Sequence, residues 1–333
     1  MIISRTPLRI SFFGGGTDYP VWYRKRKGAV LSTTIDKYCY ITLRYLPPFF
    51  PHKHRVVYSK VERTKSIEDI LHPVVRETLK FLNINKGMEI HYDADLPART
   101  GLGSSSSFTV GLLHSLYALK GIMPSKERLM KEAIRMERDI LKENVGSQDQ
   151  AAAANGGFNK ISFFDDDEIN LEPVTIKESR KKELENHLML FFTGFTRLAS
   201  KVAKKQIKNT PAKEKELCRM YQMVDEAKNI LSEKNNILDF GRLLDETWRL
   251  KRSLTSEISN SAIDDIYHKA LKGGALGGKL LGAGGGGFIL FFVPPERQEA
   301  VEKELRDLLR VKFNFESGGS QIIYYNTESA VNL

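Results

Sequence analysis

Three glycine-rich segments constrain what these 333 residues can fold into more than any other feature of the chain. They lie at residues 14–16, 101–103 and 282–287, each near a stretch that reads as a strand. Glycine lets backbone N–H groups approach an anion closely because no Cβ stands in the way. Where a helix follows, its free N–H groups and the positive end of its dipole hold that anion. The chain is therefore expected to bring backbone loops to an anionic ligand.

The second segment fits this design best. A strand precedes it, Gly101 and Gly103 permit a turn, and Ser104–Ser107 open an apolar helix that runs to Leu119. It has neither the lysine of the P-loop pattern nor the spacing of a dinucleotide fingerprint. We interpret it as a phosphate cradle whose hydroxyls could also reach a magnesium ion. The alternative is an ordinary helix capped by serine.

Composition narrows the class of protein. Hydrophobic residues make up 41% and charged residues 28%, as in soluble globular proteins, which excludes a disordered, collagen-like or coiled-coil chain. No apolar run approaches the roughly 18 residues of a membrane span. The N-terminus lacks the apolar core of a signal peptide. Cys39 and Cys218 are too few for a disulfide framework, so we expect a cytoplasmic location and no contact with a membrane.

The net charge of +10 is local. Residues 24–65 hold eleven Lys and Arg against Asp36 and Glu62, a net +9. A solvated basic face and a field that attracts an anionic ligand both remain open. Nucleic acid is not expected as a partner, because the chain has no long basic tail, zinc-ligand spacing or aromatic single-strand motif.

The pattern of apolar residues predicts a mixed fold in two parts, with a boundary between residues 165 and 185. Strands are expected at 8–13, 28–35, 38–45, 53–60, 88–93, 188–193, 288–293 and 321–325. Helices are expected at 67–82, 104–119, 126–144, 151–154 and 296–312, with residues 198–272 mostly helical and an acidic hairpin tip at 165–168. Regular βαβ repeats are lacking, so the fold class is α+β.

The segment from Leu96 to Ser107 resembles the GLGSSS motif of the GHMP kinases, and the other two glycine segments match that family's remaining motifs in the same order. The resemblance spans residues 5 to about 292. It implies a ribosomal-protein-like α/β domain at 1–175, with the nucleotide loop at 96–107 and a catalytic segment at 137–150. It also implies a ferredoxin-like domain at 176–333, with a glycine loop at 282–287 and the active site in the cleft between the domains.

Within that family, the motif GGGTDY and residues 96–108, 137–150 and 192–194 are similar to the bacterial D-glycero-D-manno-heptose 7-phosphate kinases. This implies ATP-dependent phosphorylation of the anomeric hydroxyl to the 1,7-bisphosphate, for GDP-heptose and surface polysaccharide synthesis. Galactokinases carry an acidic residue and a histidine where this chain has Gly15-Gly16, which argues against galactose. Two alternatives stay open, namely a kinase for another, fucose-like sugar and a non-catalytic sugar sensor.

The resemblance also assigns roles to residues. It implies catalysis by Asp149 and Arg9, and a magnesium ion held by Ser105 and Glu137. It places the nucleotide at Gly101, Leu102, Gly103, Ser104, Ser105, Ser106, Gly284 and Gly285. It places the sugar phosphate at Thr17, Asp18, Tyr19, Thr193, Gly194 and Arg197, with Lys37, Arg44 and Arg55 as rivals for the substrate phosphate. ATP, Mg²⁺ and a sugar phosphate are the expected ligands, and a homodimer stays open.

Residue chemistry supports the central assignments. Glu137 shares a helical stripe with Ile134 and Leu141, and a buried carboxylate is costly unless it is paired or bound to metal. Asp149 could accept the proton of an attacking hydroxyl, although it could instead cap a short helix. Arg9 could hold that carboxylate and the transferring phosphoryl group, or form a purely structural ion pair. Together these three residues argue against a sensor.

Overall fold

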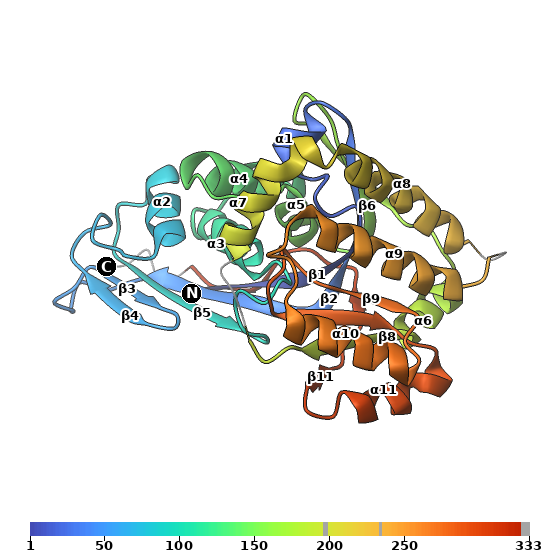
Figure 1. The fold of residues 1–333 in the computed structure, drawn as a ribbon. Coiled ribbons are helices and arrows are strands. Elements are labelled where there is room, and N and C mark those ends of the chain that lie inside the picture. Colours follow the sequence, from blue (N-terminus) through green and yellow to red (C-terminus); the bar gives the residue numbers. More distant parts are fainter. Residues whose placement is uncertain (196–198, 233–234, 328–333) are drawn as a thin grey trace.

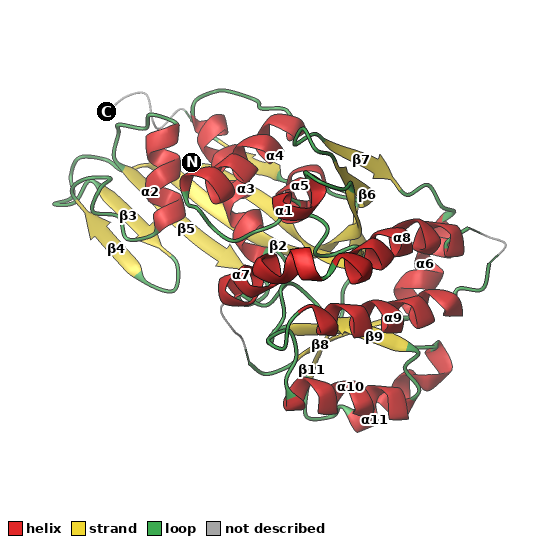
Figure 2. Ribbon diagram, turned by 45° about the horizontal axis from the view of Figure 1, so that its top comes forward, coloured by secondary structure: helices red, strands yellow, loops and turns green. Residues whose placement is uncertain are grey.

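Two β-sheets organise the chain in the computed structural model, which describes residues 1–195, 199–232 and 235–327 (Figure 1). Within that part, the first sheet has nine strands along the path β13-β1-β2-β5-β3-β4, with β12 and β6 beside β2 and β7 beyond β6. The second has four strands in the order β11-β8-β10-β9. Figure 2 shows α2, α3, α4 and α5 over the first sheet and α10 and α11 beside the second.

The strands of the first sheet are β1 (Ile2–Phe13), β2 (Gly28–Tyr45), β3 (His54–Val57), β4 (Val61–Thr64), β5 (Met88–Ala94), β6 (Phe158–Phe163), β7 (Ile169–Pro173), β12 (Phe315–Glu316) and β13 (Gln321–Tyr325). Those of the second are β8 (Leu188–Phe192), β9 (Gly277–Leu280), β10 (Phe288–Phe292) and β11 (Leu309–Val311). The α-helices are α1 (Pro20–Tyr23), α2 (Pro73–Phe81), α3 (Ser104–Leu119), α4 (Lys126–Ile134), α5 (Gln148–Asn155), α6 (Glu178–Asn186), α7 (Ala199–Asn209), α8 (Glu214–Ile230), α9 (Leu238–Leu254), α10 (Ser261–Gly273) and α11 (Gln298–Glu304). A π-helix covers Arg135–Ile140, and short 3-10 helices cover Thr210–Ala212 and Pro295–Arg297.

The two strands expected at 28–35 and 38–45 are one continuous strand, β2. The register against β1 shifts at this point, since Pro7 lies opposite Tyr38 while Leu8 lies opposite Ile35. Such a bulge inserts extra residues without ending the strand, and it re-aims the side chains beyond it. The break between the two expected strands is therefore a bulge within β2 rather than a turn.

The second sheet confirms the ferredoxin-like expectation. Its order places the first and third strands in the centre, with β8 and β10 antiparallel from Leu188↔Phe292 to Phe192↔Phe288. All five residues of β10 are buried, as a central strand covered on both faces requires. None of the helices in the described ranges combines the length and the apolar character needed to cross a membrane.

Three helix predictions need correction. The helix expected from residue 67 starts only at Pro73, since proline favours the first turn of a helix. The helix expected over 126–144 is α4 followed by a π-helix, and it ends at Ile140. The helix expected over 296–312 stops at Glu304, and residues 309–311 instead pair with β8 as an edge strand. Tertiary pairing overrides helical propensity at this third site.

The domain limits are also different from those expected. Residues 315–325 do not belong to the second domain, because β12 pairs with β2 and β13 pairs with the edge of β1. The register Ile2↔Tyr325 brings the two ends of the described chain side by side. Of the predicted second domain, 176–333, the strands β12 and β13 therefore lie in the first sheet, and the domain boundary itself stays a prediction. The return of the chain covers an edge of β1 that would otherwise be open to another strand.

This return predicts a stability test. Ending the chain after residue 314 should lower Tm by several degrees, because β1 loses its edge partner and about 1 kcal/mol is worth 2–4 °C in a chain of this size. Ending it after Asn326 retains both returning strands and should leave Tm unchanged. Thermal unfolding of the two truncated proteins measures the difference, and equal Tm values would show that β12 and β13 add nothing to the first sheet.

Candidate active site

The second and third glycine segments touch through their backbones. A Cβ added to Gly101 would lie 2.3 Å from the Leu281 carbonyl oxygen, and one added to Gly282 would lie 2.4 Å from the Gly101 Cα. The Phe288 amide donates to the Thr100 carbonyl at 3.0 Å. Any larger residue at Gly101 or Gly282 would force the loops apart, which is why glycine is needed at both. The second sheet thus supports the loop that opens α3.

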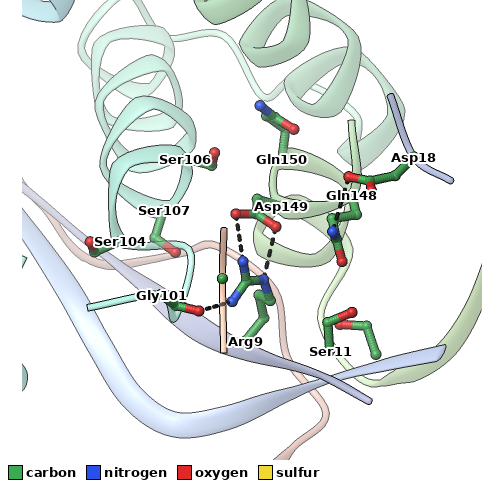
Figure 3. A network of polar contacts seen from close by, with 12 residues as sticks. Arg9, Ser11, Asp18, Gly101, Ser104, Ser106, Ser107, Gln148, Asp149 and Gln150 are labelled. Carbon is green, nitrogen blue, oxygen red and sulfur yellow. Dashed lines mark hydrogen bonds and ion pairs between the residues drawn. The ribbon is translucent and has the colours of Figure 1, made fainter. Parts of the chain in front are cut away.

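Arg9 and Asp149 form a bidentate ion pair at the centre of the site (Figure 3). Arg9 lies on β1, and its Nε and Nη2 donate to the two Asp149 carboxylate oxygens at 2.8 Å each. Its Nη1 donates to the Gly101 carbonyl at 2.5 Å, and its backbone amide donates to the Leu102 carbonyl at 3.0 Å. Arg9 is buried, whereas the Asp149 side chain is 24% exposed and can be reached by a ligand. One guanidinium therefore joins the catalytic segment to the predicted nucleotide loop.

The loop before α3 has the geometry of an anion site. Gly103 is the residue before the helix, with a left-handed φ of 77°, and a Cβ there would lie 3.1 Å from the Arg9 Cγ. The first N–H groups of an α-helix have no partner within the helix. Ser105 is exposed at this end, whereas Ser104 and Ser106 are buried. The first turn of α3 can thus present backbone donors beside the ion pair.

Glu137 is fully buried and lies on the π-helix. Such a widened turn is frequent at functional sites, and here it turns the carboxylate toward α3 and α5. Ser106 Oγ donates to Glu137 Oε2 at 2.9 Å and Gln150 Nε2 at 2.5 Å, while Oε1 is buried without a hydrogen-bond partner. Burial raises the pKa of this carboxyl to about 7, against the opposing effect of the hydrogen bonds from Ser106 and Gln150.

An orphaned buried carboxylate oxygen fits a divalent cation, and so does a hydroxyl-rich helix start close by. The direct neighbour of Glu137 is Ser106, however, and not Ser105 as the resemblance implies. Ser105 as a magnesium ligand thus stays a prediction. In the described ranges no three His, Cys, Asp or Glu side chains form a metal cluster. A metal here would depend on hydroxyl and phosphate oxygens for its other ligands.

The first loop holds its predicted sugar ligands in structural roles. Thr17 is fully buried, and its hydroxyl lies 2.8 and 2.9 Å from the Gly14 and Ala29 carbonyl oxygens, which share its one hydrogen. The hydroxyl expected to contact the sugar is therefore already engaged, and Thr17 shapes the loop instead. Tyr19 is 8% exposed, and burial raises its pKa. A contact between Tyr19 and the sugar stays a prediction.

Asp18 connects the first loop to the catalytic segment. It is 2% exposed, it accepts from the Gly16 amide at 2.9 Å, and it accepts from Gln148 Nε2 at 2.9 Å (Figure 3). A Cβ on Gly146 would lie 1.8 Å from an Asp18 carboxylate oxygen. Burial raises the pKa of Asp18, and the neighbouring Asp149 charge adds to the effect. Its contact with the sugar stays a prediction as well.

The third loop packs against the second and is itself held by hydrogen bonds. Gly284 packs against Ile258, and the Gly285 amide donates to the Ile258 carbonyl at 2.9 Å. Both glycines are buried, and their contacts with the nucleotide stay predictions. Thr193 is also committed, because its hydroxyl donates to the Gly287 carbonyl at 2.9 Å. The contact of Thr193 with the substrate stays a prediction.

Gly194 and Arg197, two residues predicted to bind the substrate, follow the end of β8 in the chain. Gly194 is exposed, with a left-handed φ of 84°, and has open space around its Cα. Its contact with the substrate stays a prediction. Arg197, expected to bind the substrate phosphate, lies outside the described residues.

The basic segment does not gather around the catalytic pair. Arg44 and Arg55 both form ion pairs with Glu89, and Lys37 pairs with its neighbour Asp36. Figures 1 and 2 place β3 and β4 at the end of the first sheet away from α5, which carries Asp149. Arg44 and Arg55 are therefore not at the active site, and Lys37 is already paired. The excess charge is therefore distributed, with four of its eleven cations on strands of the first sheet and the others, including Arg24–Lys27 after α1, between elements.

Sequence reasoning missed several buried polar residues of the site. Gln148 and Gln150 flank Asp149 and bind Asp18 and Glu137, and their place in the motif could have indicated this. Lys251 and Lys279 are 5% and 2% exposed, and no pattern singled them out. Lys279 stands in an apolar strand between two glycines and two leucines, where a charged residue is unusual.

Comparison with known proteins agrees with this geometry. The model described as GHMP kinases N terminal domain matches residues 69–157, and the model described as GHMP kinases C terminal matches residues 225–311. D-glycero-alpha-D-manno-heptose 7-phosphate kinase of Campylobacter jejuni subsp. jejuni serotype O:2 is 32% identical over 317 residues, which cover 92% of this chain and 93% of that protein.

More distant relatives share the architecture. The bifunctional fucokinase/GDP-fucose pyrophosphorylase of Arabidopsis thaliana is 25% identical over 93% of this chain and 31% of its own length. The crystal structure of a D-glycero-D-manno-heptose 1-phosphate kinase from Bacteroides thetaiotaomicron has a TM-score of 0.78 at 24% identity, over 98% of this chain and 100% of that one. This last likeness shows the fold.

The buried carboxyl of Glu137 predicts how stability depends on pH. A folded pKa of about 7, above the ordinary 4.5, means that the group stabilises the metal-free fold fully below pH 4.5. That contribution is lost as pH rises through 7. Glu137→Gln removes this ionisation. The free energy of unfolding of the variant, minus that of the native protein, should therefore rise by up to about 3 kcal/mol between pH 4.5 and pH 8.

Denaturant unfolding at both pH values, without magnesium, measures this change. Glu127→Gln, at an exposed position on α4, is the control and should show no comparable gain. A constant difference between Glu137→Gln and the native protein would mean that Glu137 is already ionised in the free protein.

Proposed function

The chain belongs to the GHMP kinases and is an ATP-dependent sugar kinase, and we propose that it phosphorylates the anomeric hydroxyl of D-glycero-D-manno-heptose 7-phosphate. The product would be the 1,7-bisphosphate, an intermediate for GDP-heptose and surface polysaccharides. The observation that carries the proposal is the 32% identity to a heptose 7-phosphate kinase over nearly the whole of both chains. The Arg9–Asp149 pair beside the second loop gives that likeness a chemical centre.

Phosphoryl transfer requires the nucleotide phosphates, a metal and the attacking hydroxyl to be held in line, with charge stabilised on the transferred group. Under the proposal, the phosphates bind at the start of α3, to backbone donors of Gly101, Leu102, Gly103 and Ser104–Ser106. The left-handed Gly103 and the positive end of α3 support this placement.

Asp149 is assigned to the sugar hydroxyl. Its carboxylate is held by Arg9 but keeps 24% of its side chain exposed, so that a hydroxyl can approach it. It orients this hydroxyl toward the phosphate and accepts its proton as the bond forms. Arg9 is buried and contacts both Asp149 and the Gly101 carbonyl, so its positive charge lies where negative charge accumulates during transfer.

Magnesium is assigned to the side of the site that holds Glu137. The unpartnered Oε1 of Glu137 and the neighbouring serine hydroxyls would hold the ion. When bound, the ion neutralises charge on the nucleotide phosphates. Gln150 and Ser106 keep the carboxylate turned toward the start of α3. The third loop contributes by fixing Gly101 in place.

The role of Asp149 predicts a selective loss of rate. Asp149→Asn should lower kcat by about 10²- to 10⁴-fold, because the amide cannot accept the proton, and leave KM for ATP within a few fold. Asp139→Asn, which removes a half-exposed carboxylate from the preceding helix, is the matched control. Steady-state kinetics with coupled ADP detection measures both, and a kcat for Asp149→Asn equal to that of the control would remove it as the proton acceptor.

A substrate panel tests the identity of the sugar. Heptose 7-phosphate should give the highest kcat/KM among heptose 7-phosphate, heptose 1-phosphate, fucose and galactose. Phosphorus NMR of the product should show a new phosphate on the anomeric carbon. Preference for fucose or for heptose 1-phosphate would replace the specific proposal and leave the kinase assignment in place.

A further inference from the structure

Two buried lysines of the C-terminal half lie next to the glycine loops without a carboxylate partner among the described ion pairs. Lys251 lies on α9 and is 5% exposed; Lys279 lies on β9 and is 2% exposed. Burial, with a smaller effect of the Arg9 charge, lowers the pKa of Lys251 to about 7, and burial also holds the pKa of Lys279 well below its usual range. Such charges destabilise a core unless a specific contact requires them.

Both lysine Nζ groups donate to backbone carbonyls at loop boundaries. Lys279 Nζ donates to the Ser11 and Phe12 carbonyls at 2.9 and 2.8 Å, at the end of β1 and just before the first glycine loop. Lys251 Nζ donates to the Leu280 and Gly282 carbonyls at 3.0 and 2.5 Å, where the third loop leaves β9. The two lysines therefore hold the first and third loops by their backbones.

The contact made by Lys251 is linked to the Arg9–Asp149 ion pair through Gly282 and Gly101. Gly282, whose carbonyl it binds, packs directly on Gly101, with only 2.4 Å between the Gly101 Cα and the place of a Gly282 Cβ. The Gly101 carbonyl accepts from Arg9, which holds Asp149. A shift of the third loop would therefore move the second loop or open the Arg9 contact.

Lys279 holds the end of β1 rather than the third loop. It joins β9 to β1 across 267 and 268 sequence positions, on the strand that carries Arg9. The sheet pairings do not link these two strands, since β9 belongs to the second sheet and β1 to the first. This side chain is thus a direct link between the two sheets at the site.

We infer that Lys251 and Lys279 are positioning residues for phosphoryl transfer, which hold the third loop and the end of β1 so that the nucleotide loop and the Arg9–Asp149 pair stay in register. This inference rests on the proposed role of the second loop in nucleotide binding. Lys251 sets the position of the nucleotide loop, and Lys279 sets that of β1 with Arg9 and the first loop.

Lys251→Met keeps the length of the side chain but removes its donors and charge. Because the two hydrogen bonds that fix the third loop are lost, we expect the Kd for a non-hydrolysable ATP analogue to rise about tenfold or more. Tm should stay close to that of the native protein, because an unpaired buried charge is removed at the same time. Lys251→Arg, which retains a cationic donor, should recover part of the affinity.

Lys279→Met should give a different pattern, with a kcat at least about tenfold lower and a smaller change in the nucleotide Kd. Thr247→Val is the matched control, because Thr247 is fully buried one turn before Lys251 and its hydroxyl reaches only the Met223 sulfur. It should change neither kcat nor Kd by more than about twofold.

The measurements are calorimetric titration with the ATP analogue, steady-state kinetics and thermal unfolding of each variant. Unchanged Kd and kcat in both methionine variants would overturn the inference. So would losses that follow Tm alone and appear equally in Thr247→Val. Failure of the native protein to bind the analogue, or displacement of the analogue from a site that Gly103→Ala does not affect, would instead count against the proposed nucleotide site.

Discussion

The bidentate ion pair between Arg9 and Asp149 is the interaction on which the rest of the site depends. Its two members come from β1 and from the start of α5, 140 positions apart, and the same guanidinium also holds the Gly101 carbonyl. An arginine can satisfy a carboxylate with two parallel donors and still have one for a third group. The fold therefore has to bring the strand, the helix and the loop to one point, and each neighbouring feature serves that requirement.

Close backbone packing is the second requirement, and it is met by residues that have no side chain. Gly101 and Gly282 touch, and Gly103 leaves room for the ion pair, so the third loop can support the loop before α3 by direct backbone contact. Polar backbone groups exposed by such packing need partners in the interior. Lys251 and Lys279 supply donors to several of them, which gives these two costly buried charges a physical reason to be there.

Much of this arrangement could be predicted from the sequence. The loop around Gly101 and the strand that carries Arg9 follow from local patterns, because turn chemistry and apolar periodicity depend on neighbouring residues. The ferredoxin-like second sheet was expected from the resemblance to the GHMP kinases. The boundaries were less predictable. A bulge in β2 imitated a turn, and residues 309–311 became a strand only because β8 offers them an edge. The return of β13 to β1 joins positions more than three hundred residues apart, which no local pattern reports.

By itself, the sequence determined which backbone segments can approach an anion and which carboxylates accompany them. Glycine allows close backbone approach, serine offers a hydroxyl and aspartate a carboxylate in any fold. Only the tertiary structure decided which of these groups remain free. Thr17, Thr193 and the Gly285 amide have the right chemistry, yet their hydrogen bonds are spent inside the loops. Asp149 keeps an accessible carboxylate, and Glu137 keeps an unpartnered oxygen. Burial and the competition for hydrogen-bond partners are properties of the packed chain, and they separate a supporting residue from one that can meet a substrate.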